Sequence, residues 1–157
     1  MQKNLDANLR FGFLIHDVSR LRRIVVDRAL KPLGITRSQW WVLAFLSRRE
    51  GMTQTALAAE LDLTKVAIGG LVDRMESGGF VERRADKKDA RARRVFLTTE
   101  GQRLVETIRE AVDAVETSIL AQVTGSELEQ ASAVLLKIKD QLIDLVGEDA
   151  ETQGFDG

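Results

Sequence analysis

The sequence predicts a mainly α-helical protein with a small β-wing, in which a winged helix-turn-helix is joined to a helical dimerisation region. Three observations predict this fold class. Apolar residues recur at steps of three and four along most of the 157 residues, two short helical patterns flank a tight turn near the middle of the chain, and two strand-like runs enclose a charged tip directly after them. The chain contains one proline, which further favours helix.

The composition excludes several classes of function. The chain has no cysteine and one histidine, so it lacks a thiolate nucleophile and the ligands for a thiolate zinc site or a multi-histidine metal centre. It shows no clustered nucleophile and base and no glycine-rich phosphate loop, which argues against an enzyme and against a bound cofactor. The longest apolar run, Trp40 to Leu46, is too short to span a bilayer, and no signal peptide is apparent. We therefore expect a cytoplasmic protein with no membrane partner.

Charge is distributed unevenly along the chain. The first 50 residues carry ten basic and four acidic side chains, whereas residues 99–157 carry four basic and thirteen acidic ones. Between Glu82 and Arg94, seven basic side chains stand against three acids. This pattern indicates an anion-binding surface on a nearly neutral protein, although a solvated loop would have the same composition.

Two adjacent apolar stripes predict the first helix. One begins at Leu14, and the other contains Phe11 and Ile15. A helix that is apolar on more than one side must be covered on more than one side, and in so short a chain the second partner can be another subunit. The Pro-Leu-Gly sequence at residues 32–34 ends this helix.

Threonines that can act as N-caps mark the starts of the next three helices. Thr36, Thr53 and Thr64 precede helical patterns that end near Arg49, Leu61 and Ser77. Thr36 also has Gln39 at the spacing of a capping box. The second and third of these helices are separated only by the turn at residues 62–63, which is typical of a helix-turn-helix. The outer side of the last one carries Lys65, Val66, Gly69, Gly70, Asp73 and Arg74.

A hairpin and two long helices complete the predicted fold. Strand-like runs at residues 80–85 and 93–97 enclose a charged tip, which predicts a wing. A helix then runs from Thr98 or Thr99 to about Val123. Ser126 and Glu129 have capping-box spacing and predict the start of a last helix, whose apolar residues repeat at steps of three and four.

Three segments resemble a known family. Residues 30–36 with Trp40 look like the junction between the first two helices in the SlyA-like branch of the MarR family of bacterial transcription regulators. Residues 71–76 and 79–81 resemble the end of that family's recognition helix. Residues 89–91, followed by 95–98 and Gly101, resemble its wing and the start of the next helix. The resemblance covers the chain to about residue 146 and implies a homodimer that binds double-stranded DNA at an inverted repeat.

The resemblance divides the chain into functional regions. Residues 1–35 and 99–147 are expected to form the dimerisation region, residues 36–98 the DNA-binding domain, and residues 148–157 a flexible acidic tail. The expected dimer contacts are Phe11, Ile15, Leu128, Leu135, Ile138, Leu142 and Leu145.

The expected DNA contacts lie on the helix-turn-helix and the wing. They are Thr53, Gln54, Thr64, Lys65, Val66, Gly69, Gly70, Arg74, Arg83, Arg84, Lys87, Lys88, Arg91 and Arg93, with Asp89 as a brace for a neighbouring arginine. Arg91 suits a narrow A·T minor groove, whereas the other wing cations are candidates for phosphate contacts. Because neighbouring strand residues face opposite sides, only about half of these cations can face DNA.

Gly69 and Gly70 depart from the pattern of the resembled family, whose members often carry polar or basic residues there. Each glycine costs a helix about 1 kcal/mol relative to alanine. Our hypothesis is that the bare backbone approaches base edges while Val66 touches a thymine methyl. The alternative is that neither glycine touches a base.

The resemblance also implies an effector, a small aromatic carboxylate or a phenolic compound, that binds between the dimer helices and the DNA-binding lobe. His16 and Arg20 are one helical turn apart and could hold a carboxylate, with Phe13, Trp40 and Phe45 as apolar walls. The alternative is that His16 and Trp40 are ordinary packing residues. The expected function is therefore that of a repressor released by such a ligand, and the competing hypothesis is an architectural DNA-binding or protein-interaction module without an effector.

Overall fold

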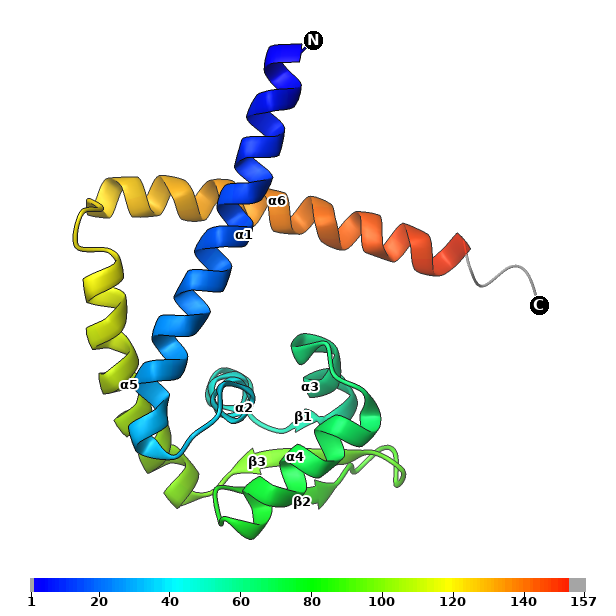
Figure 1. The fold of residues 1–157 in the computed structure, drawn as a ribbon. Coiled ribbons are helices and arrows are strands. Elements are labelled where there is room, and N and C mark those ends of the chain that lie inside the picture. Colours follow the sequence, from blue (N-terminus) through cyan, green and yellow to red (C-terminus); the bar gives the residue numbers. More distant parts are fainter. Residues whose placement is uncertain (1, 153–157) are drawn as a thin grey trace. The chain divides into compact units, whose positions relative to one another are not determined.

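The computed structural model describes the backbone of residues 2–152 and the side chains of residues 6–147. Its elements are, in chain order, α1 (Gln2–Leu30), a 3₁₀ turn (Lys31–Leu33), α2 (Arg37–Arg48), β1 (Met52–Thr53), α3 (Gln54–Leu61), α4 (Lys65–Ser77), β2 (Val81–Ala85), β3 (Arg93–Leu97), α5 (Thr99–Ile119) and α6 (Gly125–Thr152) (Figure 1). The predicted fold class, mainly helical with a small β-wing, is confirmed. Two compact units can be distinguished, one up to residue 117 and one from residue 118 onward.

The three predicted threonine caps are present. At the start of α2, the Gln39 N–H donates to Thr36 Oγ1 (3.3 Å) and the Thr36 N–H donates to Gln39 Oε1 (2.9 Å), so the capping box is complete. Thr53 and Thr64 accept from backbone N–H groups three residues on, each at 3.1 Å. Such caps satisfy N–H groups that the helix itself leaves unpaired, which is why the threonines locate the helix starts.

The wing belongs to a three-stranded antiparallel sheet in the order β1-β3-β2. The β2–β3 hairpin is the predicted one, and it pairs Arg83 with Val95 and Arg84 with Arg94. Strand β1 was not predicted. It has two residues, of which Met52 pairs with Val95, and so short a strand shows no alternation in the sequence.

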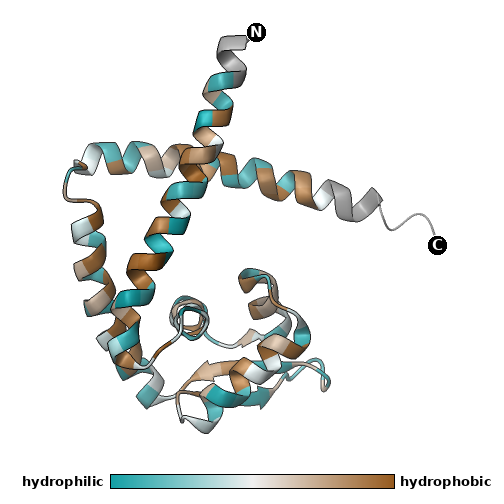
Figure 2. Cartoon of the chain, viewed as in Figure 1, coloured by the Kyte–Doolittle hydropathy of each residue, from teal (hydrophilic) through white to brown (hydrophobic). Residues whose placement is uncertain are grey.

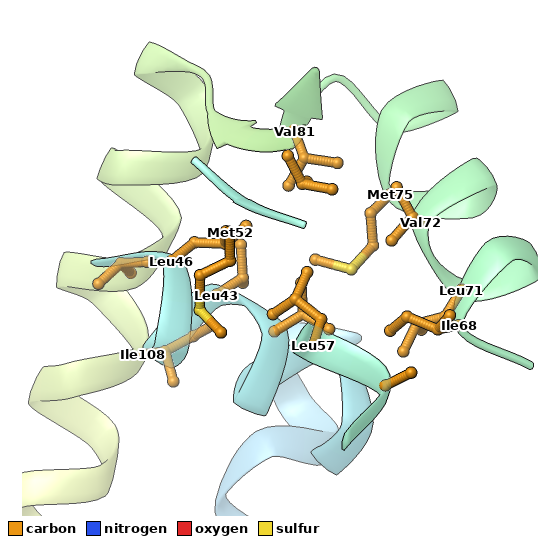
Figure 3. Packing of buried hydrophobic residues seen from close by; sticks show 14 of the residues in the cluster. Leu43, Leu46, Met52, Leu57, Ile68, Leu71, Val72, Met75, Val81 and Ile108 are labelled. Atoms are coloured by element: carbon orange, nitrogen blue, oxygen red, sulfur yellow. The ribbon is translucent and has the colours of Figure 1, made fainter. Parts of the chain in front are cut away.

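One hydrophobic core joins the helix-turn-helix, the sheet, α2, α5 and the C-terminal end of α1. Leu43 and Leu46 of α2 point toward Leu57 of α3 and Ile108 of α5, close to Met52 of β1 (Figure 3). The same cluster contains, from α4 and β2, Ile68, Leu71, Val72, Met75 and Val81. This core fixes α4 on the sheet and leaves its opposite side free.

Helices α1 and α6 each carry apolar residues along their described length (Figure 2). Many of these side chains are exposed. In α1, only Val26 and Leu30 enter the core, whereas Phe13 is 69% exposed. The other exposed apolar residues of α1 are Leu9, Phe11, Leu14, Ile15, Val18, Leu21, Ile24 and Val25. Those of α6 are Leu128, Val134, Leu135, Leu136, Leu142, Ile143, Leu145 and Val146. So much exposed apolar surface is unusual for a monomer.

The start of α6 corrects one prediction. The capping box uses Thr124 and Glu127, not Ser126 and Glu129: Thr124 N–H donates to Glu127 Oε2 (2.9 Å), and Glu127 N–H donates to Thr124 Oγ1 (3.2 Å). The two motifs overlap in sequence. The preceding turn ends at Val123, so the next residue, Thr124, is the one that caps α6.

The end of α6 also differs from the expectation. Its backbone is helical to Thr152, past residue 148, where the sequence predicts a flexible tail. Glutamate and alanine are good helix formers, and no glycine or proline occurs between residues 148 and 152. Residues 153–157 of the expected tail lie outside the described part of the chain. Of the described helices, none combines the length and the apolarity that crossing a membrane requires.

Candidate nucleic-acid interface

The turn between α3 and α4 sets the geometry of the helix-turn-helix. Asp62 ends α3 in the left-handed conformation (φ 53°), and the Leu63 N–H donates back to the Ala58 carbonyl (2.9 Å). Aspartate tolerates this conformation better than most residues. Because Thr64 caps α4 immediately afterwards, α3 and α4 form the helix-turn-helix that the sequence predicts.

Helix α4 buries one side and presents the other. Ile68, Leu71, Val72 and Met75 lie in the core. On the opposite side the exposed residues include Lys65, Val66, Asp73 and Arg74. Val66 is 86% exposed, the largest value among the exposed large hydrophobic residues. An aliphatic side chain that is kept in water without a partner fits a surface that something else covers.

The packing around Gly69 and Gly70 does not by itself require glycine. A Cβ on Gly69 would lie 4.0 Å from Gln54 Nε2, and a Cβ on Gly70 would lie 3.6 Å from Arg74 Nη1. Both are ordinary van der Waals distances, so the chain has room for alanine at both positions. That bases approach these glycines remains a prediction.

Asp86 organises the tip of the wing, a role that the sequence analysis missed. Its Oδ1 accepts from the N–H groups of Lys88 (2.7 Å) and Asp89 (3.1 Å), and its Oδ2 accepts from Arg94 Nε. The carboxylate side chain is only 7% exposed. The Lys88 N–H, then the Arg94 guanidinium and the Asp89 N–H, lower the pKa of Asp86 below its ordinary value of 3.8.

The predicted brace at Asp89 takes a different form. Asp89 Oδ1 accepts from the main-chain N–H of Arg91 (2.9 Å) rather than from a guanidinium. At the wing tip, Asp86 rather than Asp89 holds an arginine side chain, that of Arg94. Arg94 Nη1 also donates to the Gly51 carbonyl (2.7 Å). Asp89 thus shapes the backbone at Arg91 and leaves the Arg91 side chain free to reach outward.

Arg83 does not stand on the surface as a phosphate contact would. Its side chain is 21% exposed and is directed at α3 and α4. It reaches Gln54 Oε1 (2.7 Å) and Asp73 Oδ1 (2.6 Å), among other acceptors. Arg84, the next residue, faces the other side of the sheet, where its guanidinium lies 4.3 Å from the centre of the Phe96 ring and pairs with Glu82.

The remaining wing cations are exposed. Within the described part of the chain, no side-chain hydrogen bond or ion pair occupies Lys87, Lys88, Arg91 or Arg93. The same holds for Lys65 and Arg74 on α4. These six cations are therefore available to an anionic partner.

The predicted effector residues are only partly brought together. Phe13, His16 and Arg20 are exposed on α1, and Arg20 is 3.5 Å from Asp17 of the same helix. Trp40 and Phe45 of α2 pack against the core. No described hydrogen bond or ring contact joins the two groups, and the ring that lies against Phe45 is Trp41 (5.8 Å between centroids) rather than Trp40.

An open depression of about 520 Å³ lies at the junction of α1 and α2. It is lined by Asp27, Lys31, Gly34, Ile35, Thr36, Arg37 and Ser38, and none of the five predicted effector residues is among them. Arg37 is paired with Asp27 across it (2.9 Å).

All the candidate interface residues except Arg93 fall in the region that relates the chain to a known family. Residues 33–92 match the MarR family. The chain is 30% identical to a crystallised transcriptional regulator of the MarR family from Rhodococcus sp. RHA1, over 83% of this chain and 93% of that chain, with a TM-score of 0.75. This chain belongs to the MarR family.

Two further MarR-family structures are relevant to the site. A mutant of MarR from E. coli complexed with operator DNA is 28% identical, over 85% of this chain and 96% of that chain, with a TM-score of 0.73. CouR from Rhodococcus jostii RHA1, bound to p-coumaroyl-CoA, is 29% identical, over 82% and 90% of the chains, with a TM-score of 0.72.

The family membership answers the question of enzymatic activity. MarR-family proteins are DNA-binding transcription regulators and not enzymes, and this chain is one of them. In the described part of the chain, no group of three or more histidine or acidic side chains could hold a metal ion.

Proposed function

We propose that this MarR-family regulator is a homodimer that binds an inverted repeat in double-stranded DNA and represses transcription until a small aromatic acid or phenolic compound releases it. The observation that carries the proposal is an uncovered α4 face beside a wing on which four cations have no side-chain hydrogen bond or ion pair within the described chain: Lys87, Lys88, Arg91 and Arg93. The MarR structure with operator DNA supports a DNA-binding role for this surface, since that structure aligns over 85% of this chain.

The proposed DNA contacts divide into groove contacts, which reach the bases, and phosphate contacts. Lys65, Val66 and Arg74 on α4 are proposed to face the major groove, where Val66 can pack on a thymine methyl. Arg91 enters an adjacent minor groove, whose negative potential favours arginine. The phosphate contacts are proposed to come from Arg84, Lys87, Lys88 and Arg93 and from the start of α3 at Thr53 and Gln54. Thr64 and the two glycines complete the proposed surface.

The dimer is proposed to form through the apolar residues that the single chain leaves uncovered. Phe11 and Ile15 are 43% and 40% exposed, and Leu135 and Leu142 are 50% and 55% exposed. Burying such side chains removes water from apolar surface and is the main driving force of subunit association. The proposal assigns residues 1–35 and 99–147 to dimerisation and residues 36–98 to DNA binding. A two-fold dimer would place two α4 helices about one DNA turn apart, roughly 34 Å.

The effector is proposed to bind beside α1 and α2. His16 and Arg20 would hold its carboxylate, and Phe13, Trp40 and Phe45 would cover its ring. CouR bound to p-coumaroyl-CoA supports a phenolic ligand class. Assignment to the SlyA-like branch rests on residues 30–36 and Trp40 alone. A titration of tryptophan fluorescence with benzoate-type acids tests this part, because saturable quenching together with loss of DNA binding is expected, and the absence of both would refute it.

The decisive experiment for the function is selection from a pool of random duplexes, followed by footprinting on the recovered sequence. A sequence-specific dimer should recover an inverted repeat and protect it on both half-sites, with an affinity that falls steeply with salt. An architectural protein would bind the unselected pool as tightly as the recovered sequence. Recovery of no common sequence would refute the proposal.

A further inference from the structure

We propose that Arg83 is a positioning residue that holds the wing in register with α4, so that the minor-groove arginine and the major-groove residues meet one DNA duplex at a fixed separation. This inference rests on the proposed DNA-binding function but concerns a residue whose own side chain does not touch DNA. It replaces the expectation that Arg83 is a phosphate contact.

The contacts of Arg83 join three elements. Its Nε donates to Gln54 Oε1 of α3 (2.7 Å), and its Nη2 donates to the Gly69 carbonyl of α4 (3.1 Å). Nη2 also lies 2.6 Å from Asp73 Oδ1, and Nη1 lies 3.4 Å from Glu76 Oε1. Glu76 Oε2 in turn accepts the main-chain N–H of Arg83 on β2 (2.8 Å). Both the side chain and the backbone of one β2 residue are thus tied to α4.

The burial of Arg83 separates it from the other cations of the wing. Its side chain is 21% exposed, against 60% for Arg84, its neighbour in β2. A guanidinium that already makes four directed contacts has little capacity left for phosphate. Lysine carries the same charge but lacks the planar fork, so it cannot reproduce contacts to α3 and α4 at once.

Arg83 also controls the charge of the α4 surface. Asp73 and Glu76 are carboxylates on a helix that faces a polyanion, and Asp73 is 66% exposed. The guanidinium lies against both of them, which lowers the negative potential that they would present to phosphates. This explains how a recognition helix can carry an acidic residue on its outer side.

The fold does not depend on Arg83 alone, which makes the inference testable. The wing has a second anchor, since Arg94 Nη1 donates to the Gly51 carbonyl (2.7 Å) and β3 pairs with β1. Removing the Arg83 contacts should therefore leave the wing folded while loosening its position relative to α4.

The test compares Arg83→Lys and Arg83→Ala with the wild type on a duplex recovered by random-pool selection, across a range of salt concentrations. Arg103→Lys serves as the matched control, because Arg103 is an exposed arginine of α5. A positioning residue predicts that both Arg83 variants bind about tenfold more weakly, with an unchanged slope of log affinity against log salt, because no phosphate contact is lost. A phosphate contact predicts instead that the lysine variant binds like the wild type and that the alanine variant lowers the slope by about 0.9 per subunit. That second result would overturn the inference.

Hydrogen exchange of the free protein separates this inference from the proposed function. Arg83→Lys should speed exchange of backbone amides in residues 81–85 and leave those of α5 between residues 105 and 112 unchanged. Unchanged exchange in β2 would overturn the positioning role even if DNA binding is confirmed. Faster exchange in a protein that selects no duplex would support the positioning role of Arg83 and refute the proposed function.

Discussion

Gly101 of α5 lies directly against the backbone of Phe80, at the entry to the wing. A Cβ on Gly101 would stand 2.0 Å from the Phe80 carbonyl oxygen and 3.3 Å from Leu97 Cδ2. The contact is further tied by Thr98, whose Oγ1 donates to the Gly79 carbonyl (2.6 Å) and accepts from the Gly101 N–H (3.0 Å). The start of α5 and the base of the hairpin therefore form one rigid joint.

Gly101→Ala is expected to destabilise the protein by about 2–3 kcal/mol, because the methyl group can be accommodated only if backbone moves. The measurement is urea unfolding followed by circular dichroism. Gly125→Ala is the control, since a Cβ there meets nothing within 4 Å, and its unfolding midpoint should stay close to that of the wild type. Equal midpoints for the two variants would show that the joint yields easily.

Asp86→Asn is expected to loosen the wing at neutral pH, because the amide cannot accept from Lys88, Asp89 and Arg94 together as the carboxylate does. The pKa of Asp86 is lowered in the folded protein. The stabilisation by the carboxylate is therefore complete above the ordinary value of 3.8 and is lost as pH falls through the lower folded pKa.

The stability difference between wild type and Asp86→Asn, measured by urea unfolding, should accordingly stay constant from about pH 5 to pH 8 and shrink below the ordinary pKa. A difference that grows on acidification would contradict the role assigned to this carboxylate.

Thr124→Ala should lower the stability of α6 by about 1 kcal/mol, since it removes the side chain that caps the Glu127 N–H. Ser126→Ala is the matched control. Within the described part of the chain, Ser126 Oγ accepts from the Gln130 side chain alone (3.3 Å), so its loss should have little effect. Thermal unfolding of both variants decides between the two overlapping capping boxes, and a larger effect of the serine variant would favour the one that the sequence analysis chose.

The helix starts could be predicted because a cap is local chemistry: Thr36, Thr53 and Thr64 each act on N–H groups within three residues. The overlap at Thr124 and Ser126 shows the limit of that approach, because both motifs satisfy the same spacing rule. Only the end of the preceding turn decides between them.

The roles of Arg83 and Asp86 could not be predicted, because they depend on strand register and on what the sheet packs against. The alternation of a strand predicts that Arg83 and Arg84 face opposite sides, but not which side meets α4. Likewise, the Asp86 partner Arg94 is eight residues away in sequence and becomes a neighbour only when the hairpin closes. The two-residue strand β1 depends on its pairing with β3 for the same reason.

Arg91→Ala is expected to weaken binding to the selected duplex about tenfold, equivalent to ~1.4 kcal/mol, by removing the cation proposed to enter the minor groove. The dimer should stay intact in sedimentation, because Arg91 is remote in sequence from the proposed dimer residues. Arg103→Ala removes the same charge from the exposed surface of α5 and is the control. Unaltered affinity of the Arg91 variant, or an equal loss in both variants, would contradict the assigned contact.

The most direct test of the account is the stoichiometry of the protein on its selected duplex, measured by analytical ultracentrifugation. We expect two chains on one inverted repeat and a dimer in the free protein at micromolar concentration, because the apolar residues that α1 and α6 leave exposed are proposed to be covered by a second subunit. A free monomer that binds a single half-site as tightly as the full repeat would contradict the account.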